Sequence, residues 1–187
     1  MAADRIELIL DRAMDFATER SHEYVTLEHL LLSVLQEPPI HKIIEQLKVN
    51  IDSISSDLLG YIDNEMGILV RDKTQPRKTQ SLERVFNRAV TQVLFSGRKT
   101  LMPRDILVSI MSEKDSHANY FLMKHGLTRQ SLVQFLTKDA IEQHRRESSI
   151  MGNAEQGERA GSQFEDFCHD LNEQAKQGNI DDIIGRE

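Results

Sequence analysis

The sequence has little of what several classes of protein require. Its single cysteine, Cys168, excludes an internal disulfide framework. No apolar run approaches the roughly 20 residues of a membrane-spanning helix, and the first residues form an amphipathic pattern without the apolar stretch of a signal peptide. The formal net charge of −7 leaves no basic excess of the kind that nucleic-acid-binding proteins use. These absences predict a soluble, cytoplasmic protein that binds neither nucleic acid nor a membrane.

Catalytic motifs are missing as well. The sequence has no Gly-x-x-x-x-Gly-Lys-Ser/Thr phosphate loop, so we expect this stretch of chain to hydrolyse no ATP. Cys168 is followed by His169, but adjacent residues of a helix point in different directions and do not form a nucleophile–base pair. The sequence therefore predicts no enzyme activity and no bound cofactor in this chain.

Histidines near the N-terminus raise the question of a metal site. The candidate ligands lie within a short stretch: His22, Glu23, His29 and His41. Their spacing matches no structural zinc motif, and no cysteine accompanies them. We expect no functional metal, and any metal bound there to be adventitious.

What the sequence does contain is an internal duplication. A shift of 76 positions places Ile6–Ala13 on Leu82–Ala89 and Leu30–Leu35 on Ile106–Met111, with apolar residues on apolar residues. A tandem repeat of about 60 residues predicts two copies of one helical unit packed against each other. Two copies are too few for a solenoid, so we expect a globule with pseudo-twofold symmetry.

Apolar residues at helical spacing predict four helices in each copy. Repeat 1 covers about residues 1–62 and repeat 2 about 79–140. Residues that favour the start of a helix stand at the expected places: Thr26, Pro38, Asn50, Thr79, Pro103 and Thr128. Met102 stands where repeat 1 has Thr26, so this side-chain cap is missing. The pattern predicts an all-α fold without strands of comparable strength.

The remaining segments have a different composition. A connector, 63–78, joins the repeats; residues 141–163 are polar and indicate a flexible linker. Residues 164–187 begin with a short amphipathic helix. Six apolar residues lie in or near the connector: Tyr24, Val25, Met66, Ile68, Leu69 and Val70. Either they form an exposed patch that binds unfolded chains, or the connector folds back and buries them.

Three short motifs on this double repeat resemble a known family. The run His22–Leu32, HEYVTLEHLLL, and Ser96-Gly97-Arg98 resemble the N-terminal domain of the Clp/Hsp100 unfoldases. The run and Thr74-Gln75-Pro76 are most similar to the ClpA branch. The final residues, Ile183–Glu187, resemble the opening of the first AAA+ ATPase module, so we expect 164–187 to be its start, cut short. The resemblance implies the double Clp N motif fold over 1–140.

The resemblance also implies a role in docking. In ClpA-like proteins this domain is a mobile cap on a hexameric ring that uses ATP and Mg to unfold proteins and feed them to the ClpP peptidase. The implied partners are the adaptor ClpS, which delivers N-degron substrates, and unfolded proteins; the isolated domain is expected to be a monomer. Ile183 and Ile184 would pack near the adenine of ATP in the whole protein. The positions that match the ClpS-docking surface are Glu23, Glu28, Thr79 and Arg84.

Two alternatives stay open at this point. Judged as residues alone, Glu23 and Glu28 are anions favoured near a helix start, Thr79 is an N-cap and Arg84 is a solvated cation. The domain could also be a structural cap that shields the pore or aids hexamer assembly without binding an adaptor.

Overall fold

The computed structural model describes residues 2–66 and 75–151, with side chains described over 5–66 and 75–142 and at Arg145. The predicted all-α fold of two four-helix repeats is confirmed. The helices are α1 (Ala2–Glu19), α2 (Leu27–Leu35), α3 (Pro38–Gln46), α4 (Ile51–Asn64), α5 (Gln80–Phe95), α6 (Pro103–Ile110), α7 (His117–Lys124) and α8 (Arg129–Met151). Two short strands, β1 (Tyr24–Val25) and β2 (Arg77–Lys78), precede α2 and α5. Within the described residues, none of the helices combines the length and apolarity needed to cross a bilayer.

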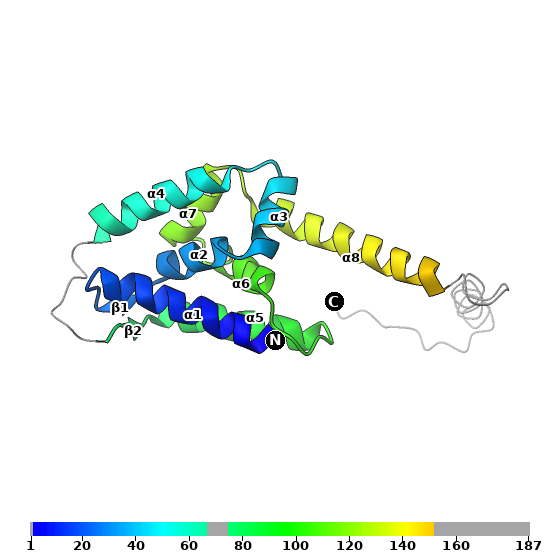
Figure 1. The fold of residues 1–187 in the computed structure, drawn as a ribbon, viewed down its shortest axis with the longest axis horizontal. Helices are drawn as coiled ribbons and strands as arrows, with labels where there is room; N and C mark the ends of the chain where they lie inside the picture. Colours follow the sequence, from blue (N-terminus) through cyan, green and yellow to red (C-terminus); the bar gives the residue numbers. More distant parts are fainter. Residues whose placement is uncertain (1, 67–74, 152–187) are drawn as a thin grey trace, which may run out of the picture. The chain divides into compact units, whose positions relative to one another are not determined.

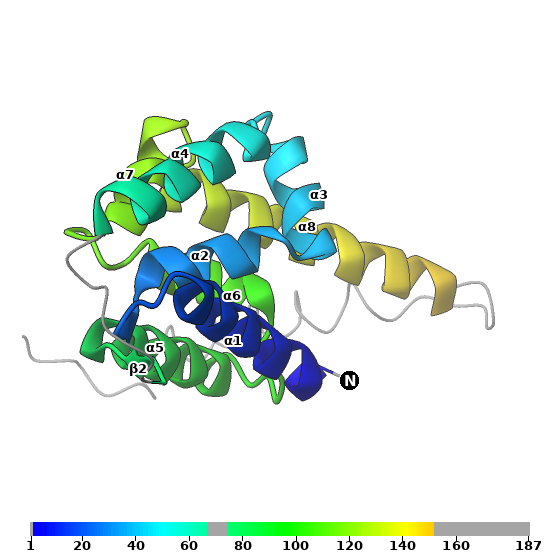
Figure 2. The same ribbon diagram turned by 60° about the vertical axis from the view of Figure 1, so that its left-hand side comes forward.

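The first seven helices, α1 to α7, lie in layers (Figures 1 and 2). Helix α1 packs on α2, α5 packs on α6, and α2 meets α6 in the middle, while α4 and α7 cover α2 from the other side. Buried residues of both repeats belong to one apolar cluster, among them Ile9, Leu31, Leu82 and Ile106. The two copies therefore share a single core, as the duplication predicts.

The duplication extends to polar contacts. Ser33 Oγ donates to the Ile9 carbonyl oxygen over 2.7 Å, and Ser109 Oγ donates to that of Val85 over 2.8 Å. Each serine thus ties the second helix of its repeat to the first. Both residues of one bond are related to both residues of the other by the shift of 76 positions, so the two repeats make the same polar contact at equivalent positions.

An arginine–glutamate pair repeats in the same way. Arg12 pairs with Glu37, and Arg88 Nη2 lies 2.6 Å from Glu113 Oε1. The same shift of 76 positions relates both members of the two pairs. The pair therefore has a structural role common to both repeats.

Most predicted helix starts are capped as expected. The Asn50 side chain accepts from Ser53 N–H over 3.1 Å, and Thr128 Oγ1 accepts from Ser131 N–H over 3.1 Å. At α6 the missing side-chain cap is replaced from inside the helix, because Asp105 Oδ2 accepts from Met102 N–H over 2.9 Å. A carboxylate three residues into a helix can satisfy the backbone that a cap side chain leaves free.

One expectation about the connecting segments needs correction, and one open alternative is decided for two residues. Strands β1 and β2 pair in parallel although no strand was predicted, because two-residue strands are too short to leave a period in the sequence. Val25 and Met66 are buried, 1% and 7% exposed, so they are not part of an exposed patch. Ile68, Leu69 and Val70 lie outside the described residues.

The first compact unit of the chain ends at Asp139, next to the domain boundary predicted at residue 140. Helix α8 continues to Met151, so the expected linker 141–163 begins with helix rather than flexible chain. This part of α8 was not predicted because its residues are polar, and a helix without an apolar face has no hydrophobic period. The rest of that segment, and 164–187, lie outside the described residues.

Candidate functional site

The two short strands hold together the two helix starts that carry the four residues predicted for docking. Tyr24 pairs with Arg77 and Val25 with Lys78 in parallel. Thr79 N–H donates to the Val25 carbonyl oxygen over 3.2 Å. Because α2 and α5 each begin two residues after their strand, both helices start at the same end of the pair. We call Glu23, Glu28, Thr79 and Arg84, which surround these two starts, the helix-start edge.

The two glutamates of this edge lie in different environments. Glu23 is half-buried, and its backbone oxygen accepts from Arg77 N–H over 2.8 Å. Glu28 is 7% exposed, and its Oε1 accepts from Ala118 N–H over 3.1 Å, in the first turn of α7. A carboxylate at this place is favoured by the positive end of the α7 dipole. Glu28 therefore ties α2 of repeat 1 to α7 of repeat 2, a structural role that its sequence position did not reveal.

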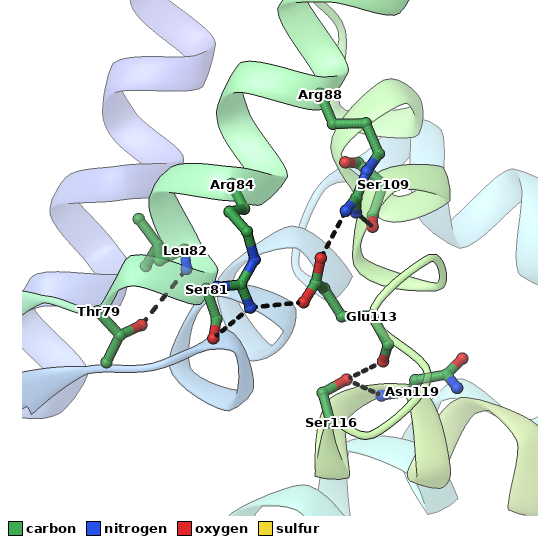
Figure 3. Close-up of polar contacts among 9 residues, drawn as sticks. All are labelled: Thr79, Ser81, Leu82, Arg84, Arg88, Ser109, Glu113, Ser116 and Asn119. Atoms are coloured by element: carbon green, nitrogen blue, oxygen red, sulfur yellow. Dashed lines mark hydrogen bonds and ion pairs between the residues drawn. The ribbon is translucent and has the colours of Figure 1, made fainter.

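Arg84 projects from the first turns of α5 into a polar network (Figure 3). Its Nη2 donates to Ser81 Oγ over 3.1 Å and to Glu113 Oε2 over 2.9 Å, while Arg88 binds the other oxygen of Glu113. Hydrogen bonds from Arg84 and Arg88 hold the pKa of Glu113 below its usual range, although partial burial raises it. Two arginines on one carboxylate leave a net positive charge at this point, with Arg84 the more exposed of the two.

A polar pocket lies beside this network. It has a volume of about 370 Å³ and joins the start of α2, the first turns of α5 and the loop before α7. Its lining residues are Leu27, Ser81, Arg84 and the residues from Ser112 to Ser116. Sequence reasoning missed Glu113 and this loop. The signal was present in the duplication, because the shift that relates Arg88 to Arg12 also relates Glu113 to Glu37.

The pseudo-equivalent place in the other repeat has different residues. The shift of 76 positions places Arg84 on Leu8 and Glu28 on Arg104. Leu8 is 59% exposed and apolar, so the exposed arginine of the helix-start edge has no charged counterpart at the related position of repeat 1.

Thr79 has a structural role that can be measured. Its Oγ1 accepts from Leu82 N–H, at 3.4 Å, and it is the N-cap residue of α5. We expect Thr79→Ala to lower the free energy of unfolding by about 1 kcal/mol through the lost cap. Urea unfolding at neutral pH measures this, with Thr79→Ser, which keeps the hydroxyl, as the control. Equal stability of both variants and the original chain would show that the hydroxyl does not cap α5.

A second concave surface was not predicted at all. An apolar groove of about 480 Å³ runs between α1, the end of α5 and the loop that follows it. Its lining residues are Ile6, Val90, Val93, Leu94, Lys99, Thr100 and Leu101. In this lining Leu94 is 68% exposed, and Phe95, the next residue and the last of α5, is 88% exposed. The shift of 76 positions places Leu94 and Phe95 on Thr18 and Glu19 of repeat 1. This replacement of polar by apolar residues in the second copy was the sequence signal for an apolar surface.

The residues of the metal hypothesis do not form a site. His22 and His29 are buried, and His22 Nδ1 lies 3.0 Å from His29 Nε2, whereas His41 is exposed on α3. Among the described side chains, those of 5–66, 75–142 and Arg145, no three histidine, cysteine, aspartate or glutamate residues gather as metal ligands would. Cys168, His169, Ile183 and Ile184 lie outside the described residues.

Comparison with known proteins decides the family. Residues 1–125 match the Clp repeat (R) N-terminal domain. The chain belongs to this family. It is 31% identical, over 97% of its length, to a ClpA homolog protein of Fuscovulum blasticum. It spans 24% of the length of that relative.

Solved structures agree with the Clp N-domain fold. The chain is similar to the N-domain of ClpV from Vibrio cholerae, with a TM-score of 0.60 and 22% identity over 74% of this chain and 83% of that one. A complex of a ClpV N-domain with a VipB peptide is also similar, with a TM-score of 0.56 and 22% identity over 71% of this chain and 81% of that one. The fold is therefore that of an N-terminal domain of the Clp/Hsp100 family.

Proposed function

We propose that this domain docks adaptors and substrates for a ClpA-like ATP-dependent unfoldase that feeds the ClpP peptidase. The adaptor would be ClpS, which delivers N-degron substrates, and it would bind the helix-start edge. The domain itself would do no chemistry; ATP and Mg would be used by the ring of the whole hexameric protein. The observation that carries the proposal is the parallel β1–β2 pair, which brings the predicted docking residues of both repeats to one place.

The helix-start edge has the chemistry of a selective protein contact. Arg84 is 55% exposed and held by Glu113, so its guanidinium is oriented before a partner arrives. Preorganised charges give specificity and fast association more than raw affinity. Glu28 is buried on Ala118, so we expect it to act by fixing the start of α2, while Glu23, Thr79 and Arg84 meet the adaptor.

The apolar groove supports direct capture of unfolded substrate. An exposed Leu94 in the lining of a groove of about 480 Å³, with exposed Phe95 next to it in the chain, is the kind of surface that binds apolar peptide segments. The similar ClpV N-domain has been solved with a VipB peptide, so a domain of this fold binds a peptide in that protein. Two separate surfaces would let adaptor and substrate bind at once.

Replacing Phe95 tests the substrate surface. We expect Phe95→Ser to weaken binding of a permanently unfolded probe, reduced and carboxymethylated α-lactalbumin, by about tenfold, because one aromatic contact is lost. Binding of labelled ClpS should not change. The matched control is Tyr120→Ser, which removes a 57% exposed aromatic side chain from α7. Fluorescence anisotropy measures both affinities.

The results separate the proposal from the structural-cap alternative. A domain that only shields the pore or aids assembly would bind neither ClpS nor the probe. Equal loss of probe binding in Phe95→Ser and Tyr120→Ser would place substrate capture elsewhere than the apolar groove.

A further inference from the structure

A pair of buried histidines stands where the second repeat has an ion pair. The shift of 76 positions places His22 on Arg98 and His29 on Asp105. In repeat 2, Nη1 and Nη2 of Arg98 donate to the two carboxylate oxygens of Asp105 over 3.1 and 2.7 Å. Asp105 in turn accepts from Met102 N–H at the start of α6. The ion pair thus fixes the start of the second helix of its repeat.

The histidines make the corresponding contacts without charge. His29 Nδ1 accepts from Thr26 N–H over 3.2 Å, and His29 Nε2 lies 3.0 Å from His22 Nδ1. Because Nδ1 of His29 is an acceptor, its ring hydrogen is on Nε2 and is donated to His22. His22 therefore accepts at Nδ1 and carries its own hydrogen on Nε2. Both rings are neutral, and their hydrogen bonds fix both tautomers.

A further proton has no place in this arrangement. A protonated imidazole donates from both nitrogens, so a proton on His29 Nδ1 would face Thr26 N–H and would break that backbone hydrogen bond, although Thr26 Oγ1, 3.0 Å away, could accept it. A proton on His22 Nδ1 would face the Nε2–H of His29. Burial first, then His22 and Arg20, lower the pKa of His29 to about 3. Burial, followed by the charge of Arg20, also lowers the pKa of His22.

The charges around the pair act in opposite directions. Arg20 opposes a proton on either ring, whereas Asp63 on α4 favours one on His22. Arg20 Nε also binds Asp63 Oδ1 over 2.5 Å, so the two charges largely offset each other. Other charged residues of the elements around the pair include Glu19 on α1, whose carboxylate lies 3.8 Å from Arg20 Nη1. Glu23 before β1, Glu28 on α2, and Arg77 and Lys78 on β2 are also among them.

We propose that the His22–His29 pair is an acid-sensitive latch, which holds the start of α2 closed at neutral pH and lets it open in acid. His29 holds the backbone of Thr26, which lies between Glu23 and Glu28 in the chain. Opening therefore displaces the two carboxylates of the helix-start edge. Repeat 2 has no such latch, because its arginine–carboxylate pair is already charged at neutral pH. The effect on docking rests on the proposed function; the opening itself does not.

The direction of the pH effect follows from proton linkage. Above the ordinary histidine pKa of 6.5, neither the closed nor the opened turn takes up a proton, and the latch is closed. Between 6.5 and about 3, an opened His29 binds a proton that the closed form rejects, so the closed form loses stability as the pH falls. At pH 5 the opened fraction should be about 30-fold higher than at pH 7.5.

Amide hydrogen exchange of the 187-residue chain, without any partner, tests the latch. The Thr26 amide reports directly, because its hydrogen bond is to the His29 ring. We expect its protection, corrected for the intrinsic exchange rate, to fall about 30-fold between pH 7.5 and 5. His29→Gln, which cannot titrate, should change less than threefold, and His29→Asn, which also cannot titrate, serves as a second variant if His29→Gln does not fold. His41→Gln, at an exposed histidine of α3, should behave like the original chain. Protection of Thr26 that is the same at both pH values overturns the latch.

A second arm measures ClpS affinity of the original chain and His29→Gln at both pH values. The ratio of the two affinities cancels any titration of ClpS itself. At pH 5 we expect the original chain to lose more ClpS affinity than His29→Gln does, so the affinity of the original chain divided by that of His29→Gln should be lower at pH 5 than at pH 7.5. A constant ratio together with falling Thr26 protection would overturn the link between latch and docking. Absence of ClpS binding at both pH values would contradict the docking function, and the exchange result would still decide whether the latch exists.

Discussion

Ala13→Asp is expected to unfold the domain. Ala13 lies on the inner face of α1 and is 0% exposed, so the new carboxylate would be buried among apolar side chains without a partner. Burying an unpaired charge costs more than about 4 kcal/mol, which is comparable to the total stability of a small domain. Ala89→Asp, at the duplicated position in α5 and also 0% exposed, should act in the same way. Circular dichroism during thermal unfolding measures the effect.

The control for both changes is Ala140→Asp, which introduces the same side chain at an exposed position of α8. It should keep a cooperative transition near that of the original chain. A cooperative transition in Ala13→Asp at an unchanged temperature would mean that α1 presents a different face to the core.

Arg84→Glu should have the largest effect on adaptor binding. The change removes the exposed guanidinium and places a carboxylate beside Glu113, which then repels it. We expect ClpS affinity to fall about 30-fold, or about 2 kcal/mol, since reversing an oriented charge costs more than losing a rim contact. Isothermal titration at low and high salt would show the charge dependence directly.

Arg129→Glu is the matched control, because it reverses an exposed arginine at the start of another helix, α8. Its ClpS affinity should stay within about twofold of the original. Comparable losses in both variants would show that ClpS responds to net charge and not to the helix-start edge.

The fold was largely predictable because its main features leave periods in the sequence. The apolar spacing of α1 and α5 and the shift of 76 positions predict the helices and their duplication. The features that were missed leave no such period. The two-residue strands depend on pairing between distant parts of the chain. The polar part of helix α8 beyond residue 140 depends on the hydrogen bonds of its own backbone.

The candidate site was predictable only in part. The family resemblance predicted four docking residues, Glu23, Glu28, Thr79 and Arg84, but it did not indicate which of them are exposed. Burial of Glu28 on Ala118 depends on how α2 and α7 pack, two elements from different repeats. The role of Glu113 could have been inferred from its counterpart Glu37, because the duplication preserves the ion pair. Aligning the two repeats can therefore predict a polar contact of one repeat from the corresponding contact of the other.

Mapping the ClpS contact by NMR would test the central claim most directly. Amide shifts of the ¹⁵N-labelled chain would be followed while unlabelled ClpS is added. The account predicts that the largest changes fall on residues 23–28 and 79–84 and on the loop 112–116, with residues 90–101 of the apolar groove unaffected. Changes centred on the groove, with the helix-start edge unperturbed, would contradict it.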